Sequence, residues 1–409
     1  MPIPEIRISD YTYELPSGRI AAYPAERRDA SKLLIYNKGK ISEDVFSAIP
    51  DYIGPESCMV FNNTKVVPAR LIFRKDTGAF IEIFCLEPFD PEEYNLSFSS
   101  VGTCCWKCIV GNLKRWKSGK INLYVPMWAE KEFGEIGLEA EIVSMDKGQI
   151  VVRFTWSGQW RFSEVLDKCG RIPIPPYINR EAEDIDIERY QTLYAKYRGS
   201  VAAPTAGLHF TDNVLSALKM KGIDMENICL HVGAGTFMPV KSEKIGGHPM
   251  HSEPFSVSRE LLEHLQEFSG RKKIVAVGTT SVRTLESLYY LGVKCLEAGP
   301  GNWGVEEVGQ WDPYADKKWP GLSESIGALV EYLHINRLDR LTARTRIIIV
   351  PSYRFKFTDM LITNFHQPQS TLLLLIAALI GENWRNVYGY AMGHGFRFLS
   401  YGDSSLLIP

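Results

Sequence analysis

The feature that most constrains the fold is a change of pattern within the chain. Between Leu71 and Phe154, short segments alternate apolar and polar residues, as in Ala79–Leu86 and Ile150–Thr155, and glycines or charged residues separate them. A period of two is typical of strands with one buried face. We therefore expect residues 71–154 to form a smaller all-β domain, inserted into a chain whose 409 residues exceed one ordinary core.

Helical and strand patterns alternate on both sides of this insert, which predicts one discontinuous α/β domain of mixed α+β type from residues 1–70 and 155–409. Ser or Thr caps begin its predicted helices, and glycines end them. Residues 300–345 show no clear period. We expect strands at Lys32–Asn37, Cys58–Asn62, Lys273–Gly278 and Arg346–Val350, a polar loop at Asn62–Lys65, and helices at Thr211–Lys221 and Ser258–Phe268.

Charge and hydropathy limit the classes of function. The net charge of −2 gives no overall positive field, so nucleic-acid binding would need local basic patches. Such patches occur at Lys114–Lys120, at Arg271–Lys273 and between Arg337 and Arg346, although solvated faces also explain them. The longest apolar run, Leu372–Ile380, is too short to span a membrane, and no secretory signal is visible. We expect a cytoplasmic protein with reduced thiols and no membrane partner.

Three segments carry an unusual mixture of His, Thr or Ser, and Gly or Pro: Ala203–Phe210, Leu230–Phe237 and Thr363–Thr371. Glycine lets backbone N–H groups approach a ligand, hydroxyl groups donate hydrogen bonds, and histidine can move a proton near neutral pH. Each segment alone is consistent with an ordinary loop and a buried histidine. Three such segments in one chain favour the active site of an enzyme.

Two further motifs have competing interpretations. In Val275–Thr284 a strand runs through Gly-Thr-Thr-Ser into a predicted helix, whose N-terminus suits an anion or a hydroxyl-rich ligand, or is a capped tight turn. It is not the G-x-G-x-x-G dinucleotide motif. Cys104, Cys105 and Cys108 lack the second ligand pair that a structural zinc site needs. We expect structural thiols there, and no metal.

Many motifs, in one order along nearly the whole chain, resemble the S-adenosylmethionine:tRNA ribosyltransferase-isomerases of queuosine biosynthesis. The resemblance implies an α/β catalytic domain containing a barrel-like sheet, with a smaller inserted all-β domain. The motifs are Tyr13–Pro16, Ile20–Pro24, Arg28–Leu34, Phe61–Arg70, Ile174–Ile178, Arg189–Tyr194, Val201–Phe210, Leu230–Phe237, His248–Glu253, Ala276–Arg283, Asp359–His366 and Arg397–Asp403.

The resemblance also implies the reaction. Such an enzyme transfers and isomerises the ribosyl moiety of S-adenosylmethionine onto the aminomethyl group of 7-aminomethyl-7-deazaguanine at the wobble position of a tRNA with a GUN-type anticodon. The products are epoxyqueuosine-tRNA, adenine and methionine. S-adenosylmethionine is then a co-substrate, and no permanently bound cofactor is implied. The alternatives are a catalytically silent tRNA-binding paralogue, against which the intact His and Gly-Thr motifs argue, and a methyltransferase.

Candidate site residues follow from these motifs. A proton next to the sulfonium must be removed, so a base is needed, and the acids can also hold ribose hydroxyl groups. The catalytic candidates are His231, His209, His366, Glu253 and Asp403. The substrate-binding candidates are Arg70, Thr205, Gly207, Phe210, Gly233, Gly235, Thr236, Phe237, His251, Thr279, Thr280, Arg283, Asp359, Thr363, Asn364, Phe365, Ser370, Thr371 and Tyr401.

Overall fold

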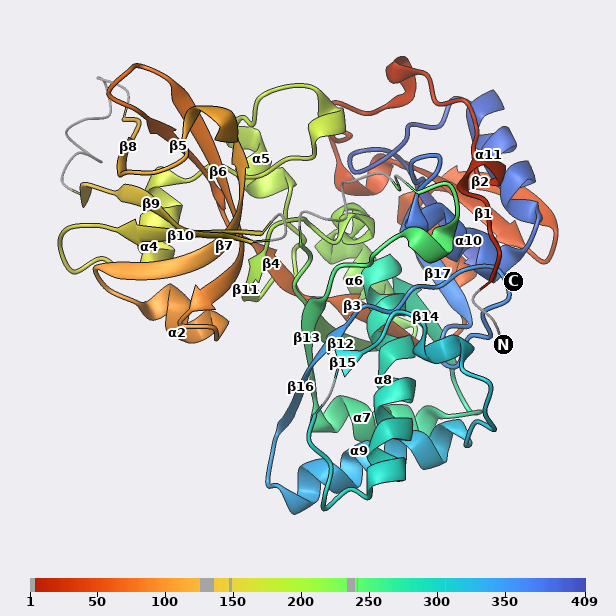
Figure 1. Cartoon of the computed structure of the whole chain (residues 1–409). Coiled ribbons are helices and arrows are strands. Elements are labelled where there is room, and N and C mark those ends of the chain that lie inside the picture. The colour runs from red at the N-terminus through yellow and green to blue at the C-terminus, as the bar shows by residue number, and fades with distance from the viewer. Residues whose placement is uncertain (1–3, 126–135, 147–148, 234–239, 241, 306) are drawn as a thin grey trace.

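The computed structural model shows two strand-rich bodies side by side (Figure 1). The structure describes residues 4–125, 136–146, 149–233, 240, 242–305 and 307–409. The larger body contains the N- and C-terminal parts of the chain and most of the helices. The smaller body is formed by the segment that the alternating pattern marks.

A ten-stranded mixed sheet forms the centre of the larger body. Its four middle strands run parallel to one another, so their carboxyl ends lie along one edge. The strands, in spatial order, are β15 (Glu307–Val308), β16 (Arg340–Thr345), β13 (Glu253–Ser258), β12 (Asp224–Leu230), β3 (Ser57–Asn62), β14 (Lys273–Val277), β17 (Met360–Asn364), β18 (Ser404–Ile408), β1 (Lys32–Asn37) and β2 (Lys40–Val45).

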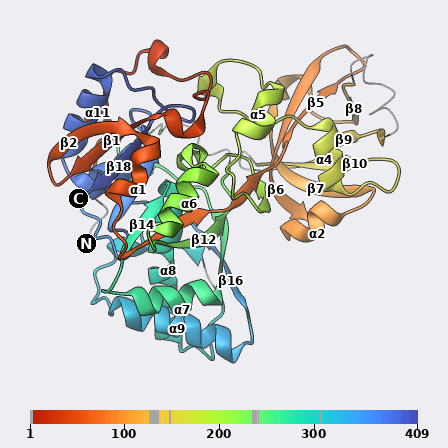
Figure 2. The ribbon, with the colours of Figure 1, turned by 180° about the vertical axis from the view of Figure 1, so that it is seen from behind.

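The middle strands are buried on both faces, because successive side chains point to opposite sides. In β3, Cys58 and Val60 join one core, and Met59 and Phe61 join another. Helices cover both faces, and the view from behind shows α1 and α6 on the side opposite α8 (Figure 2). The helices of this body are α1 (Ile49–Tyr52), α5 (Asp184–Arg189), α6 (Asp212–Met220), α7 (Arg259–Phe268), α8 (Thr279–Ala298), α9 (Leu322–Ile335), α10 (Thr371–Ile380) and α11 (Asn383–Gly393).

The smaller body is a closed six-stranded antiparallel barrel. The expected mixed α/β class with a barrel is confirmed. The barrel-like sheet was expected in the catalytic domain, whereas the closed barrel is formed by the inserted segment. Trp106, Trp116 and Phe154 lie fully buried in its core. In ring order its strands are β10 (Gln149–Thr155), β7 (Thr103–Gly111), β6 (Phe80–Asp90), β5 (Arg70–Arg74), β8 (Ile121–Leu123) and β9 (Glu139–Asp146), with helices α2 (Tyr94–Ser99) and α4 (Phe162–Cys169) packed against it.

The chain enters and leaves the barrel through a narrow neck formed by residues 68–70 and 170–171. Backbone hydrogen bonds of 3.2 and 2.8 Å join Arg70 and Arg171. Gly170 is required there, because an added Cβ would lie 1.8 Å from the carbonyl oxygen of Pro68. A short parallel pair, β4 (Thr64–Val66) with β11 (Tyr197–Ser200), lies next to the neck. The exact domain bounds, 71 and 154, stay a prediction.

The predicted helices and strands are confirmed with two exceptions. Thr211 and Ser258 cap α6 and α7 as expected. The expected strand at Arg346–Val350 is wrong: β16 ends at Thr345, and the apolar residues that follow line a cavity. The expected loop at Asn62–Lys65 was also wrong in part, because β4 begins at Thr64 and pairs with β11. In the described part of the chain, no helix is both long and apolar enough to cross a membrane.

Candidate functional site

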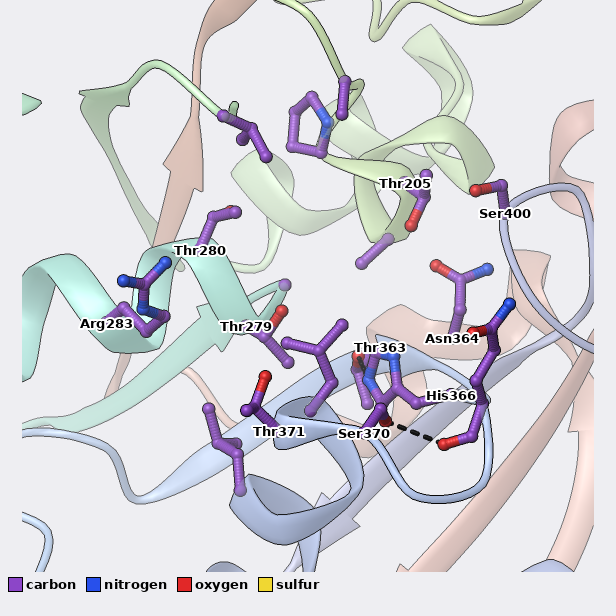
Figure 3. Close-up of a pocket in the computed structure, with 18 of the residues that line it drawn as sticks. Thr205, Thr279, Thr280, Arg283, Thr363, Asn364, His366, Ser370, Thr371 and Ser400 are labelled. Atoms are coloured by element: carbon purple, nitrogen blue, oxygen red, sulfur yellow. Dashed lines mark hydrogen bonds between the residues drawn. The ribbon is translucent and has the colours of Figure 1, made fainter. Parts of the chain in front are cut away.

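A pocket lies at the edge where β12, β14 and β17 end. Its cavity volume is about 130 Å³. Ligands of α/β proteins commonly bind outside the carboxyl ends of parallel strands. Side chains from separate segments of the chain, among them the start of α8 and the end of β17, face this space in Figure 3.

One wall is the N-terminus of α8. Strand β14 stops at Val277, and Gly278 takes a φ of 87° that turns the chain into the helix. Thr279 and Thr280 then face the pocket. The Oγ1 atom of Thr280 is buried and has no hydrogen-bond partner among the described residues. Free N–H groups and the helix dipole favour negative charge at such a terminus.

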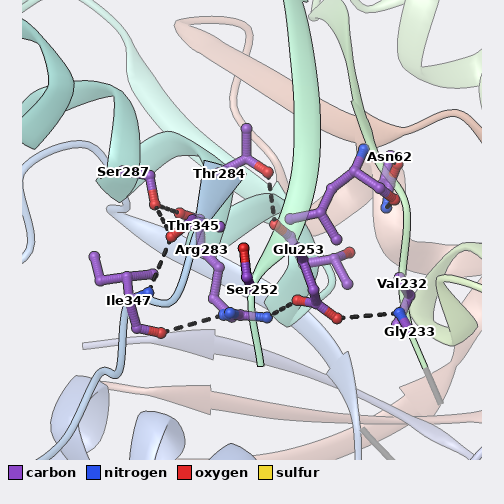
Figure 4. A network of polar contacts seen from close by, with 12 residues as sticks. Asn62, Val232, Gly233, Ser252, Glu253, Arg283, Thr284, Ser287, Thr345 and Ile347 are labelled. Atoms are coloured by element: carbon purple, nitrogen blue, oxygen red, sulfur yellow. Dashed lines mark hydrogen bonds and ion pairs between the residues drawn. The ribbon is translucent and has the colours of Figure 1, made fainter. Parts of the chain in front are cut away.

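Arg283 stands one turn further along α8, and its guanidinium is held at two of its three nitrogens (Figure 4). Nη1 donates to Glu253, and Nε donates to the carbonyl of Ile347 at 3.3 Å. Arg283 is 8% exposed and Glu253 is 4% exposed, so this ion pair is buried. Nη2 has no partner within the described part of the chain. A fixed guanidinium with one unused donor therefore lines the pocket.

Glu253 has a second task at the rim. Its Oε1 accepts a hydrogen bond of 3.3 Å from the backbone N–H of Gly233. Gly233 follows β12, so this carboxylate connects the end of that strand with α8. The charge of Glu253 is thus committed to two fixed partners, which argues for a positioning role.

The end of β17 supplies the opposite wall. Thr363, Asn364, Phe365 and His366 all line the pocket. The imidazole Nε2 of His366 lies 2.9 Å from the Thr363 hydroxyl, and its backbone N–H donates to the Tyr388 hydroxyl at 3.0 Å. Burial lowers the pKa of His366 to about 3. The ring is therefore neutral near pH 7, the form that accepts a proton.

A second helix N-terminus meets the pocket beside His366. Ser370 caps α10 by accepting from the Leu373 N–H at 3.2 Å, and it donates to the carbonyl of Gln367 at 2.7 Å. Thr371 is the first residue of the helix, and both Ser370 and Thr371 line the pocket. Two helix termini thus direct partial positive charge toward the same space.

His209 lies behind the pocket, in a smaller cavity. Its Nδ1 is 2.8 Å from the Ser31 hydroxyl, and its Nε2 is 3.1 Å from the Asn364 amide nitrogen. Because an amide N–H can only donate, Nε2 accepts and Nδ1 carries the proton. Burial lowers its pKa to about 4. Both nitrogens are used, and this histidine therefore orients Asn364, whose Oδ1 has no partner among the described residues.

His231 lies between the two bodies and does not line the pocket. Its Nδ1 is 2.9 Å from the Thr64 hydroxyl, and its ring packs 4.7 Å from the ring of Tyr94 in the barrel's helix α2. Gly199 leaves room for it, since an added Cβ would be 2.8 Å from the imidazole. Burial lowers the pKa of His231 to about 4. These contacts indicate that His231 helps to hold the barrel against the larger body.

The other predicted residues divide into three groups. Thr205 and His251 line the pocket with the residues described above. Gly235, Thr236 and Phe237 lie outside the described residues. Elsewhere are Arg70, bonded to Glu82 at the neck; Gly207, against Tyr194; Phe210, in the core with Phe46; Asp359, paired with Lys273; Tyr401, bonded to Asp186; and Asp403, bonded to Arg397.

Ser400, in the predicted motif Arg397–Asp403, lines the pocket. Several other lining residues were not singled out: Tyr177, Met250 and Ile347–Ile349 add apolar walls, and His248 adds polar atoms. His248 and Met250 belong to the predicted motif His248–Glu253, so that motif was the available signal. Ile347–Ile349 were expected in a buried strand, because their apolar pattern is typical of one, and so they were not expected in a pocket wall. Among the described residues, no group of three or more His, Cys, Asp or Glu side chains is placed to hold a metal.

Comparison with known proteins gives consistent matches. The family model described as "Queuosine biosynthesis protein" matches residues 8–407. Three relatives bear the name S-adenosylmethionine:tRNA ribosyltransferase-isomerase. They are 37% identical in Trichlorobacter lovleyi (98% of this chain, 99% of that protein), 36% in Clostridioides difficile (98% and 100%), and 39% in a Thermoanaerobacter species (98% and 99%). The crystal structure of S-adenosylmethionine tRNA ribosyltransferase from Thermotoga maritima is 26% identical, covers 98% of this chain and 100% of its own, and has a TM-score of 0.46.

Proposed function

This chain belongs to the queuosine biosynthesis protein family, and we propose that its pocket transfers and isomerises the ribosyl moiety of S-adenosylmethionine onto a modified tRNA. It is an enzyme of the S-adenosylmethionine:tRNA ribosyltransferase-isomerase type. The acceptor in this proposal is the aminomethyl group of 7-aminomethyl-7-deazaguanine at the wobble position of a GUN-type anticodon. The products are epoxyqueuosine-tRNA, adenine and methionine, and the compartment is the cytoplasm.

The observation that carries the proposal is the unused donor set at α8. Nη2 of Arg283 and Oγ1 of Thr280 are buried without partners among the described residues, beside a helix N-terminus. Together they offer a charge-assisted hydrogen bond, a hydroxyl and a favourable dipole to a single anionic group. The methionine carboxylate of S-adenosylmethionine is such a group. This assignment places the sulfonium and ribose toward β17.

His366 is then the proposed base. It is neutral, faces the pocket, and is fixed by Thr363 and Tyr388. Proton removal next to the sulfonium requires a neutral acceptor at this place, since the protonated imidazole has no lone pair to offer. Loss of the proton would lead to expulsion of adenine, after which the amine of the tRNA base attacks the former ribose. Asn364 and Thr205 supply nearby polar atoms for hydroxyl groups of the ribose.

Release of adenine tests the proposal. Purified protein is mixed with S-adenosylmethionine and a tRNA carrying the 7-aminomethyl-7-deazaguanine base, and free adenine is measured over time. We expect adenine only when both substrates are present. A folded protein that binds the tRNA and releases no adenine would support the silent tRNA-binding paralogue instead. Methyl transfer to RNA without adenine release would support a methyltransferase.

A further inference from the structure

A second, smaller cavity adjoins the pocket and is lined by three arginines. Its cavity volume is about 20 Å³, so it is a small recess, and Ser400 lines both cavities. Arg28, Arg189 and Arg397 lie around it, each half-buried. They come from three distant parts of the chain, so only the fold brings their positive charges together.

Two of these arginines have no charged partner among the described residues. Arg28 donates to the backbone carbonyls of Leu208 and Glu188, at 3.1 and 2.9 Å. Arg189 also donates only to backbone carbonyls. Carbonyl groups fix the direction of a guanidinium, but they do not neutralise its charge. Both side chains are therefore held in place by neutral partners, and the Glu188 carboxylate offsets part of the charge of Arg28 from a distance.

The positive charge of the third arginine, Arg397, is compensated by an ion pair. Arg397 pairs with Asp403 at 3.1 Å, and this carboxylate also accepts the backbone N–H groups of Lys32 and Arg397, at 3.1 and 2.8 Å. The cavity thus gathers three guanidinium groups, and within the described part of the chain only that of Arg397 forms an ion pair. Burial, and then the charge of Arg189, lower the pKa of Arg28. An anion between the arginines would relieve this repulsion.

We propose that Arg28, Arg189 and Arg397 bind a backbone phosphate of the tRNA next to the nucleotide that is modified. Guanidinium groups match the geometry of phosphate, and phosphate contacts fix the register of a nucleic acid on a protein. The inference rests on the proposed function, which places the reacting base in the adjoining pocket. Enzymes that modify a base must take it out of its stack, and an anchored phosphate would hold the strand while the base enters.

Two observations favour a nucleic acid over a free anion. The first is the shared wall at Ser400, with the Asn364–His209 contact behind it, which brings the two cavities within the reach of one nucleotide. The second is Tyr23, which is 47% exposed and directly precedes the cavity residue Pro24. An exposed ring beside cationic groups can stack on a neighbouring base, although Arg180 already lies 4.2 Å from its centroid.

RNA binding, measured without turnover, tests the site. Arg28→Gln and Arg189→Gln are compared with wild-type protein for binding of an anticodon stem-loop RNA over a range of salt concentrations. We expect Kd to rise about tenfold in each variant, and the slope of log K against log salt to shrink by about 0.7–0.9. Arg27→Gln is the matched control: it removes the same charge from a 74% exposed side chain paired with Asp29, and it should change Kd less than about twofold.

A neutral methylphosphonate, placed in turn at each phosphate flanking the target nucleotide, identifies the contact. At one position it should weaken wild-type binding by the same factor as Arg189→Gln and should not weaken that variant further. Unchanged Kd in both folded variants would overturn the proposal, and so would inorganic phosphate binding that depends on Arg189 while RNA binding does not. Arginine-dependent RNA binding without adenine release would contradict the proposed function alone.

Discussion

Replacing Arg283 by lysine separates its two tasks. The guanidinium holds Glu253 with one nitrogen and the Ile347 carbonyl with another, and it leaves Nη2 for a ligand. A lysine has one ammonium group. Because an unpaired buried carboxylate is strongly destabilising, that ammonium is expected to stay with Glu253. The fold should survive in Arg283→Lys, and the pocket should lose one charged donor.

The size of the effect follows from the contact that is lost. A hydrogen bond to a charged group contributes about 1.5–3 kcal/mol, and about 1.4 kcal/mol corresponds to a tenfold change in an equilibrium constant. The Kd for S-adenosylmethionine should therefore rise about 10- to 150-fold in Arg283→Lys. The rate constant of adenine release at saturating substrate should change little, because the methionine carboxylate of S-adenosylmethionine lies away from the reacting carbon.

Calorimetric titration with two ligands checks this reasoning. Decarboxylated S-adenosylmethionine lacks the proposed partner of Nη2 but retains the sulfonium and the adenosine. Wild-type protein should bind it more weakly than S-adenosylmethionine, and the ratio of the two Kd values should be smaller in Arg283→Lys, because Thr280 and the α8 N-terminus still favour the carboxylate there. An equal loss of affinity for both ligands in Arg283→Lys would refute the contact. Thermal unfolding of the variant serves as the control for the fold.

Other predictions concern the base, the packing and the dependence on pH. His366→Asn should lower the rate constant of adenine release about a hundred- to ten-thousandfold while S-adenosylmethionine still binds, and an unchanged rate would remove this residue as the base. Gly207→Ala should lower the free energy of unfolding by about 1–3 kcal/mol, because its Cβ would lie 1.9 Å from the Tyr194 hydroxyl. Tyr194→Phe should restore only part of this loss in urea titrations, because Thr192 Cγ2 at 2.7 Å and Tyr194 Cζ at 2.9 Å would still be too close. No rescue at all would contradict the clash with the hydroxyl. The folded pKa values of about 4 for His209 and His231 lie below the usual 6.5. As pH falls from 6.5 toward 4, these histidines are protonated in the unfolded chain and stay neutral in the folded protein. The free energy of unfolding therefore decreases in this window, by about 1.4 kcal/mol per pH unit for each ring. His209→Asn should reduce the measured slope by that amount, and an identical slope would show that His209 does not titrate as described.

Local patterns were sufficient for much of the fold. Alternation marked the barrel strands, and the caps Thr211 and Ser258 marked helix starts, because these signals depend on neighbours within a few residues. The same reasoning failed at Arg346–Val350. A buried apolar run has the same composition in a strand and in a pocket wall, and only the position of the neighbouring elements distinguishes the two.

The candidate site shows the same division. The motifs brought attention to Thr279, Arg283 and His366, which the fold gathers around one cavity. They gave no reason to choose His366 over His209 or His231 as the base, since all three stand in motifs of similar composition. The roles of the other two follow from the contacts of His209 with Asn364 and of His231 with Tyr94, partners that lie far away along the chain. Such contacts have no local pattern from which to be read.

The neck has a consequence for how this architecture can be altered. Since Arg70 and Arg171 are hydrogen-bonded to each other, the whole segment between them leaves and returns at one point, and a short linker could join its ends. Excising the barrel would remove its own core without opening the ten-stranded sheet. The barrel can thus be exchanged as one unit between homologues, because both of its ends meet at one point.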